Sequence, residues 1–179
     1  IYGKKITRFS VVRYGNVIGS RGSVVEVFKK LIEENSDYLP ITDKNMTRFW
    51  MTLSESVALV LRSIDLMIGG ETFIPKLPSI KIVDLAKAMG GNKKVKFIGI
   101  RPAEKIHELL TNASNAYLTL EYKDYYLVMP STSMNIDYKS YKKNKKNELG
   151  KPVKSNFEYS SGSNNFLNIS QIKQKLPND

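Results

Sequence analysis

The chain has 179 residues, 41% of them hydrophobic, which is enough for a packed core in one domain or slightly more. It has no cysteine and a single histidine, so the sequence excludes a disulfide framework and a thiolate zinc site. The net charge of +11 raises nucleic acid as a partner, although a phosphate-bearing small molecule or an anionic surface would also suit a basic protein.

No apolar run approaches the roughly 20 residues of a membrane helix, so we expect no membrane partner. Residue 1 is Ile and no secretory leader is visible, so we expect a cytoplasmic protein whose true start precedes this chain.

Apolar periodicity predicts strands and helices in alternation over the first 110 residues, which indicates the α/β class. The predicted strands cover residues 7–13, 38–42, 71–76 and 94–100, and the predicted helices cover residues 23–35, 52–70, 79–91 and 101–110. Residues 7–13 read as a strand covered on both faces. Ser23 is a predicted helix N-cap, and Pro102 suits the first turn of the last helix.

Two further features complete this outline. Val57, Leu61 and Ile64 form a predicted core-facing stripe on the helix over 52–70. Beyond residue 110 we expect paired extended segments over 117–129, a solvated Lys/Asn-rich loop over 138–151 and a final helix over 169–176.

The end of the first strand offers the first candidate site, because ligands of open α/β sheets bind beyond the carboxyl ends of strands. Gly15 and Gly19 allow a backbone to approach a ligand closely, Asn16 offers a donor and an acceptor, and Arg21 adds a cationic fork. The alternative is a strand-to-helix turn that uses Gly and Asn for geometry alone.

Two other segments could bind an anion. Arg48 could pair with a phosphate, or could simply stack on Trp50. Arg101 lies at a predicted helix start that favours anions, and Glu104 follows one turn later, where it could hold a hydroxyl or complement the helix dipole. His107 has no neighbouring Cys or His, so we expect a partly buried helix residue and no metal site.

Several catalytic patterns are absent from the sequence. It has no G-x-G-x-x-G fingerprint, no Walker loop and no nucleophile elbow beside its one histidine. Tyr138 and Lys142 have the Tyr-x-x-x-Lys spacing but lie in the Lys-rich loop, so we assign no catalytic residue.

Four motifs in order carry a family resemblance: RFSVVRYGNVIGSRGSV, PITDKNMTRFWMTLSESV, GGETFIPKLPSIKIVDLAKAM and GIRPAEKIHELL. Together they resemble the C-terminal half of the inverting UDP-N-acetylglucosamine 4,6-dehydratases, which are extended short-chain dehydrogenase/reductases. The resemblance covers about residues 5–130 and continues loosely into FEYSSGSNN.

The resemblance implies a lyase with a Rossmann domain for NADP and a smaller domain for the UDP-sugar. Such an enzyme oxidises C4, eliminates water across C5 and C6, returns the hydride to C6 and inverts C5. It opens pseudaminic acid synthesis for surface or flagellin glycosylation, usually as a homo-oligomer. The family's cofactor loop and catalytic residues precede the part matched here, so we expect the chain alone to be inactive.

The resemblance also assigns site residues. The predicted cofactor neighbours are Val17 and, more weakly, Tyr14 and Gly15; the predicted UDP-N-acetylglucosamine contacts are Asn16, Arg21, Thr42, Arg48, Arg101 and Glu104. Arg48 and Arg101 match the pyrophosphate side, and Glu104 matches the ribose-binding carboxylate. Ala103 replaces the family's usual Gly, which would cost about 1 kcal/mol or more at a positive φ. Glu26 replaces a usual Pro in a first turn that tolerates it.

The predicted organisation is late Rossmann strands interleaved with the UDP-sugar-binding domain over residues 1–130, followed by a tail over 131–179. One alternative function is a C5-retaining 4,6-dehydratase or a 4-epimerase acting on a UDP-HexNAc. A basic nucleic-acid-binding module is a more distant alternative, because the aromatic residues are not interleaved with the Lys run; we therefore expect no nucleic-acid partner.

Overall fold

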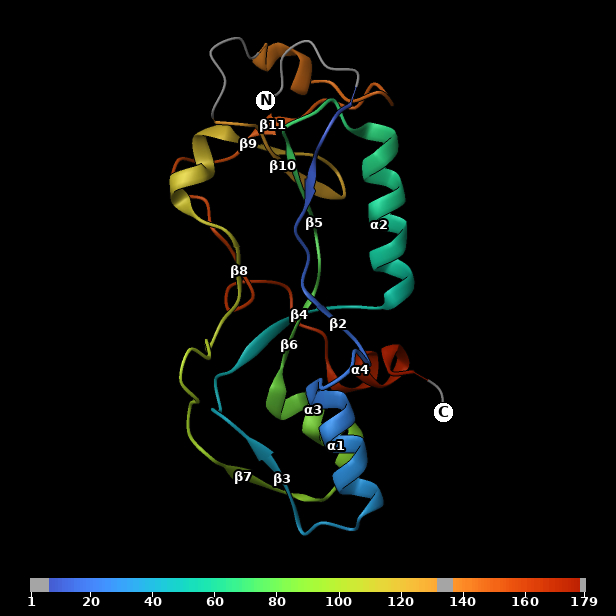
Figure 1. Cartoon of the computed structure of the whole chain (residues 1–179). Helices are drawn as coiled ribbons and strands as arrows, with labels where there is room; N and C mark the ends of the chain where they lie inside the picture. The colour runs from blue at the N-terminus through green and yellow to red at the C-terminus, as the bar shows by residue number, and fades with distance from the viewer. Residues whose placement is uncertain (1–6, 132–136, 178–179) are drawn as a thin grey trace. The chain divides into compact units, whose positions relative to one another are not determined.

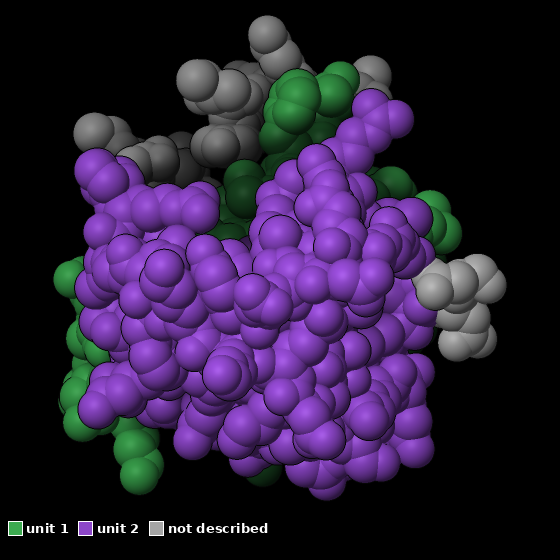
Figure 2. All heavy atoms as spheres, turned by 90° about the horizontal axis from the view of Figure 1, so that it is seen from below, with its two compact units in different colours: residues 1–14, 54–76, 110–159 green, residues 15–53, 77–109, 160–179 purple. Residues whose placement is uncertain are grey.

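The computed structural model of the chain describes residues 7–131 and 137–177 and has the predicted α/β fold (Figure 1). The chain divides into two compact units that alternate along the sequence (Figure 2). Unit 1 comprises residues 1–14, 54–76 and 110–159, and unit 2 comprises residues 15–53, 77–109 and 160–179. The predicted domain boundary at residue 130 stays a prediction, and parts of both predicted domains lie outside the described residues.

Unit 1 is built on a five-stranded sheet in the order β1-β5-β10-β9-β11. Its strands are β1 (Val11–Val12), β5 (Thr72–Pro75), β10 (Tyr125–Val128), β9 (Thr119–Glu121) and β11 (Lys151–Pro152). β1 and β5 are parallel, whereas the other pairs are antiparallel. The predicted extended pair over 117–129 is therefore confirmed as the β9–β10 hairpin.

Helix α2 (Leu53–Leu66) follows β4 (Thr47–Met51) and precedes β5 along the chain (Figure 1). Leu66 packs with Phe73 and Leu127 in the core of unit 1. The helix ends at Leu66, and two glycines with positive φ follow it, Gly69 at 129° and Gly70 at 87°. The buried carboxylate of Glu71 accepts the N–H groups of Ile68, at 2.8 Å, and of Gly69, at 2.6 Å. This carboxylate therefore satisfies donors that the sharp turn after α2 leaves unpaired.

The predicted core-facing stripe of α2 is wrong. Val57, Leu61 and Ile64 are 50%, 60% and 58% exposed, whereas Ser56 and Ser63 are buried on the opposite face. Leu66, which packs in the core of unit 1, is the third buried residue of the helix. Apolar periodicity locates a helix but does not say which face the surrounding chain covers.

The first strand is also shorter than predicted, and it is not covered on both faces. Only Val11–Val12 forms β1, while Phe9 and Val11 are exposed. The continuous apolar run that predicted a doubly buried strand therefore leaves part of its surface open within the described residues.

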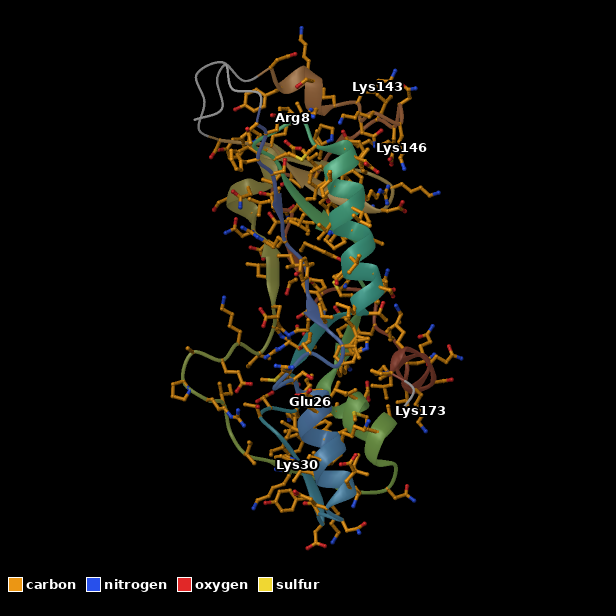
Figure 3. The ribbon with its side chains drawn as sticks, turned by 45° about the vertical axis from the view of Figure 1, so that its right-hand side comes forward. Arg8, Glu26, Lys30, Lys143, Lys146 and Lys173 are labelled. Carbon is orange, nitrogen blue, oxygen red and sulfur yellow. The ribbon has the colours of Figure 1, made fainter. Side chains whose placement is uncertain are left out.

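The Lys/Asn-rich segment over 138–151 is mostly exposed, as a solvated loop would be, but specific hydrogen bonds tie it to the rest of unit 1. It begins with the 3-10 helix η2 (Tyr138–Tyr141), whose buried Tyr141 donates its hydroxyl to the Gly69 carbonyl at 2.6 Å. Asn144 accepts the backbone N–H of Glu148 at 3.0 Å and closes the following turn. Lys143 and Lys146 point away from the ribbon (Figure 3), whereas Lys145 donates to the Asp65 carbonyl of α2 at 2.7 Å.

Unit 2 contains two small sheets and three helices. One sheet has the order β2-β4-β6, with β2 (Asn16–Val17), β4 (Thr47–Met51) and β6 (Ser79–Lys81); the other pairs β3 (Tyr38–Ile41) with β7 (Lys94–Phe97). The helices are α1 (Val24–Glu33), α3 (Ile82–Gly90) and α4 (Ile169–Lys175). Phe28, Leu39, Ile80, Leu85 and Ile172 form the centre of its core.

The helix predicted over 23–35 is confirmed as α1, which begins after Ser23 and ends in a left-handed Asn35 with φ of 54°. The helix over 169–176 is confirmed as α4. The segment over 79–91 divides differently, because residues 79–81 form β6 before α3 begins. The remaining elements are β8 (Leu109–Thr111), which pairs with β12 (Tyr159–Ser160), and the 3-10 helix η1 (Ala113–Leu118). Among the described residues, no helix has the length and apolar character needed to cross a membrane.

The exposed face of α2 yields a first prediction. Replacing Leu61 by Glu should reduce self-association of the chain and leave its melting temperature nearly unchanged, because Leu61 is 60% exposed. Light scattering and calorimetry measure the two effects. Leu66→Ala, on the buried face of the same helix, is the matched control and should cost about 2–5 kcal/mol. A similar loss of stability in Leu61→Glu would contradict the exposure of this face.

The tyrosines of unit 1 yield a second prediction, on pH. Burial raises the pKa values of Tyr122, Tyr125, Tyr126 and Tyr141 above the ordinary value of 10.0. In the unfolded chain these groups ionise near their ordinary pKa, whereas in the folded chain they ionise only at higher pH. The free energy of unfolding should therefore be independent of these groups below about pH 10 and fall as the pH rises above it.

Denaturant unfolding at pH 8 to 11, followed together with tyrosinate absorbance, tests this expectation. The hydroxyl of Tyr122 donates to the Tyr141 carbonyl, so Tyr122→Phe should lower stability at neutral pH but reduce its decline in alkali. If the free energy of unfolding of Tyr122→Phe falls with rising pH as steeply as that of the wild type, Tyr122 is not responsible for the alkaline loss of stability.

Candidate functional site

A pocket of about 390 Å³ lies entirely within unit 2. Its walls come from β2 and the following loop, the start of α1, the ends of β3 and β4, and the segment over 98–104. Seven of the nine residues predicted to bind substrate or cofactor line it: Asn16, Val17, Arg21, Thr42, Arg48, Arg101 and Glu104. Folding thus brings together side chains that are up to 88 positions apart in the sequence.

The loop after β2 supplies one wall of the pocket. Asn16 pairs with Trp50 of the parallel strand β4, which fixes where the loop begins. The loop then turns through Gly19 and Gly22, whose φ values of 72° and 71° favour glycine. The Gly22 N–H donates to the Glu26 carboxylate of α1 at 2.6 Å (Glu26 is labelled in Figure 3), so the loop is tied to the helix that follows.

The other two predicted cofactor neighbours, Tyr14 and Gly15, do not line this pocket, and Tyr14 belongs to unit 1. A Cβ at Gly15 would lie 2.4 Å from the Cβ of Phe49. Glycine is therefore required here for close packing against β4, whatever else the position does. Of the three residues, only Val17 lines this pocket.

The helix predicted over residues 101–110 is wrong, because Arg101–Glu104 forms a turn. The Glu104 N–H donates to the Arg101 carbonyl at 3.0 Å, and Ala103 has a φ of 65°. Proline at the second position and positive φ at the third are typical of a type II turn. Proline is favoured both at the start of a helix and at this turn position, so Pro102 did not discriminate between them.

The Glu104 carboxylate connects three parts of the pocket wall. It accepts the Thr42 hydroxyl at 3.3 Å and the Arg101 backbone N–H at 3.3 Å, and it lies 3.9 Å from the Arg48 guanidinium. A carboxylate has acceptor sites to spare after these contacts. Glu104 can therefore accept further hydroxyl groups from a ligand.

Positive charge dominates the pocket lining, which contains three guanidinium groups and one carboxylate. Arg21 and Arg101 are exposed, and neither side chain has a hydrogen bond or ion pair within the described residues. Arg48 differs, because its side chain is only 12% exposed and faces Glu108 at 3.5 Å as well as Glu104. The two exposed guanidinium groups are therefore available to an anionic ligand.

A polar network behind the pocket was not predicted from the sequence. The Thr47 hydroxyl lies 2.8 Å from His107 Nδ1 and 2.8 Å from the Ser161 hydroxyl, which also accepts the Glu108 N–H at 2.9 Å. A Cβ at Gly162 would lie 2.7 Å from the His107 ring. His107 is thus an exposed residue of an irregular segment, not the partly buried helix residue that we expected.

No sequence pattern links Thr47, His107 and Ser161, since their contact depends on segments far apart along the chain. Ser23 and Trp50 also line the pocket without having been predicted. The Ser23 hydroxyl and the Trp50 indole N–H are buried with no partner in the described part of the chain. Within residues 7–131 and 137–177, no group of three or more His, Asp or Glu side chains could hold a metal ion.

Comparison with known proteins gives the family of the chain. The family model described as "Polysaccharide biosynthesis protein" matches residues 1–130, so the chain belongs to this family.

Two curated relatives show what the chain is similar to. It is 50% identical over 164 residues to a UDP-N-acetylglucosamine 4,6-dehydratase (inverting) of Campylobacter jejuni, a match that covers 92% of this chain and 49% of the relative. It is 36% identical to a UDP-glucose 4-epimerase of Rickettsia bellii, covering 96% of this chain and 50% of the relative. The chain spans about half the length of the curated relatives it matches.

A solved structure shows the same fold. The protein Pen from Bacillus thuringiensis superimposes with a TM-score of 0.76 at 31% identity, covering 96% of this chain and 49% of Pen. This likeness agrees with the predicted C-terminal part of an extended short-chain dehydrogenase/reductase.

The turn at residues 101–104 yields a third prediction. Ala103 has a φ of 65°, which costs an L-residue roughly 1–2 kcal/mol, so Ala103→Gly should raise the free energy of unfolding by about 1 kcal/mol. Chemical denaturation measures the change. Ala88→Gly, inside α3 of the same unit, is the control and should lower stability. A loss of stability in Ala103→Gly would contradict the positive φ.

Proposed function

We propose that unit 2 binds the UDP moiety of a nucleotide sugar and that the chain is the substrate-binding half of a UDP-N-acetylglucosamine 4,6-dehydratase of the C5-inverting type. The observation that carries this proposal is the pocket, which gathers all six predicted substrate contacts. Two of the six, Arg21 and Arg101, are exposed guanidinium groups without a side-chain partner among the described residues. The 50% identity to the Campylobacter dehydratase supports the choice of reaction.

The pocket residues have separable roles in this proposal. Arg21 and Arg101 offset the charge of the pyrophosphate, and Glu104 accepts the ribose hydroxyls with the acceptor sites that Thr42 leaves free. Asn16 orients the sugar or its acetamido group through its amide. These contacts bind and orient the substrate, and the groups that carry out the chemistry lie outside this chain.

NADP is the proposed cofactor of the complete enzyme, and it would supply reversible hydride transfer at C4 and C6. Among the predicted cofactor neighbours, Val17 lines the pocket and could pack beside a nicotinamide. Pseudaminic acid synthesis as the pathway, a homo-oligomeric enzyme and a cytoplasmic location remain predictions.

A second candidate is a C5-retaining 4,6-dehydratase or a 4-epimerase. It is favoured by the 36% identity to UDP-glucose 4-epimerases of Rickettsia, which extends over nearly the whole chain. These reactions use the same UDP recognition and differ in the groups at the reacting sugar. Proton NMR of the product formed from UDP-N-acetylglucosamine by the complete enzyme distinguishes them.

Calorimetric titration of the chain with UDP and uridine tests the proposed binding, and this is a fourth prediction. Arg101→Gln should weaken UDP binding about tenfold or more and leave uridine binding unchanged, because only UDP carries phosphate. Glu104→Gln should weaken both ligands and lose the preference for UDP over 2′-deoxy-UDP.

Lys81→Gln is a control at an exposed residue of unit 2 that does not line the pocket. No binding of UDP by the folded wild-type chain would contradict the proposal. We also expect no product when the chain alone is incubated with UDP-N-acetylglucosamine and NADP, and turnover would show that the chain contains its own catalytic groups.

A further inference from the structure

Three polar side chains behind the pocket form one hydrogen-bonded group, here called the rear network: Thr47, His107 and Ser161. The Thr47 hydroxyl lies 2.8 Å from His107 Nδ1 and 2.8 Å from the Ser161 hydroxyl. Thr47 is 3% exposed and Ser161 is 0% exposed, and none of the three residues lines the pocket. Any effect of the rear network on a ligand must therefore pass through another residue.

Ser161 ties the rear network to two segments of unit 2. Its hydroxyl accepts the Glu108 N–H at 2.9 Å, and its own N–H donates to the Glu108 carbonyl at 2.8 Å. The same hydroxyl contacts Thr47 of β4, at the Thr47 hydroxyl and, at 3.3 Å, at the Thr47 carbonyl. Ser161 belongs to the stretch FEYSSGSNN, 53 residues after Glu108 along the chain. It therefore fixes the separation between β4 and the segment over 106–108.

These two segments carry the carbonyls that hold Arg48. Arg48 Nη1 donates to the Thr47 carbonyl at 2.7 Å and to the Ile106 carbonyl at 3.1 Å. The Ile106 carbonyl also accepts the Thr47 N–H at 2.9 Å. Because a guanidinium is planar and rigid, two acceptors on one of its nitrogens set the direction of the whole group.

The held guanidinium keeps donors for a ligand. Its Nη2 has no hydrogen bond among the described residues and lies 3.9 Å from the Glu104 carboxylate, which also lines the pocket. A guanidinium N–H forms a charge-assisted hydrogen bond with a phosphate oxygen only when it points at that oxygen. The direction of Nη2 thus depends on where the Thr47 and Ile106 carbonyls lie.

We propose that the rear network orients Arg48 toward the pyrophosphate of the nucleotide sugar, and that Ser161 is the positioning residue at its centre. Ser161 does not touch the ligand; it holds Thr47 and the segment over 106–108 at the separation that Arg48 Nη1 bridges. His107 limits the rotation of the Thr47 side chain by pairing with its hydroxyl. This assignment rests on the proposed binding of UDP, and it agrees with the match of Arg48 to the pyrophosphate side.

The variant Ser161→Ala tests the assignment and gives a fifth prediction. Without the Ser161 hydroxyl the Arg48 guanidinium is held less firmly, so UDP binding should weaken about threefold to tenfold, the loss expected for one hydrogen bond. Uridine binding should not change, because uridine has no phosphate for Arg48 to contact. The ratio of the two dissociation constants is measured by calorimetric titration.

Ser79→Ala is the matched control. Ser79 is also 0% exposed, belongs to unit 2 and does not line the pocket, and its hydroxyl accepts the Asn164 amide at 2.9 Å. This variant also removes a buried hydroxyl, but one that does not contact the rear network. It should lower stability and leave the ratio of the UDP and uridine dissociation constants unchanged.

His107 provides a second pair of variants, which keeps the test decisive should Ser161→Ala unfold, because the His107 side chain is exposed. His107→Leu removes the acceptor of the Thr47 hydroxyl and should weaken UDP but not uridine. His107→Asn retains an acceptor near the position of Nδ1 and should restore most of the binding. Equal UDP binding by these two variants would overturn the role of His107.

A double-mutant comparison separates orientation of Arg48 from a general loss of structure. Arg48→Gln should weaken UDP about tenfold, and Ser161→Ala should add little in that background, because no guanidinium remains to be oriented. Thermal melts verify that each variant is folded. Equal losses for UDP and uridine in Ser161→Ala, or a full additional loss in the Arg48→Gln background, would overturn the assignment alone. Absence of UDP binding by the wild-type chain would overturn the proposed function as well.

Discussion

The geometry of the pocket depends on the attachment of residues 104–108 to strand β4. Thr47 and Arg48 make this attachment through backbone and side-chain hydrogen bonds to a single carbonyl, that of Ile106. β4 is also the central strand of its sheet, parallel to β2 and antiparallel to β6. One strand therefore sets the positions of both walls of the pocket: the loop that carries Arg21 and the turn that carries Glu104.

The arginine side chains around this strand have two kinds of environment. The Nη1 of Arg48 donates to two carbonyls, and two carboxylates within 4 Å of the guanidinium compensate its charge. Arg21 and Arg101 are exposed, and their side chains have no hydrogen bond or ion pair among the described residues. A guanidinium without partners in the chain can pair with a phosphate through charge-assisted hydrogen bonds. Residue type alone does not distinguish these two environments of arginine.

In unit 1, too, residue type alone does not predict how the lysine-rich segment and α2 pack. Residues 138–151 have the composition of a solvated loop, yet Tyr141 and Asn144 tie the segment to the rest of unit 1 by specific hydrogen bonds. Helix α2 has an apolar stripe, yet its packed face is the one that carries Ser56 and Ser63. In both cases average hydrophobicity does not predict the observed packing, because a few specific contacts determine which side chains pack.

The sequence by itself determined the α/β class and most helices and strands, which follow from local periodicity and capping residues. The residues that gather at the pocket were assigned through the resemblance of four motifs to a known family. The tertiary structure decided what local patterns leave open. Pro102 suits a helix start or a turn equally. In the folded chain residues 101–104 form a turn with a positive φ at Ala103, and the Ile106 carbonyl just after it is hydrogen-bonded to β4. Likewise, the contacts between Thr47, His107 and Ser161 form only when distant segments meet, because hydrogen bonds depend on distance in space and not on position along the chain.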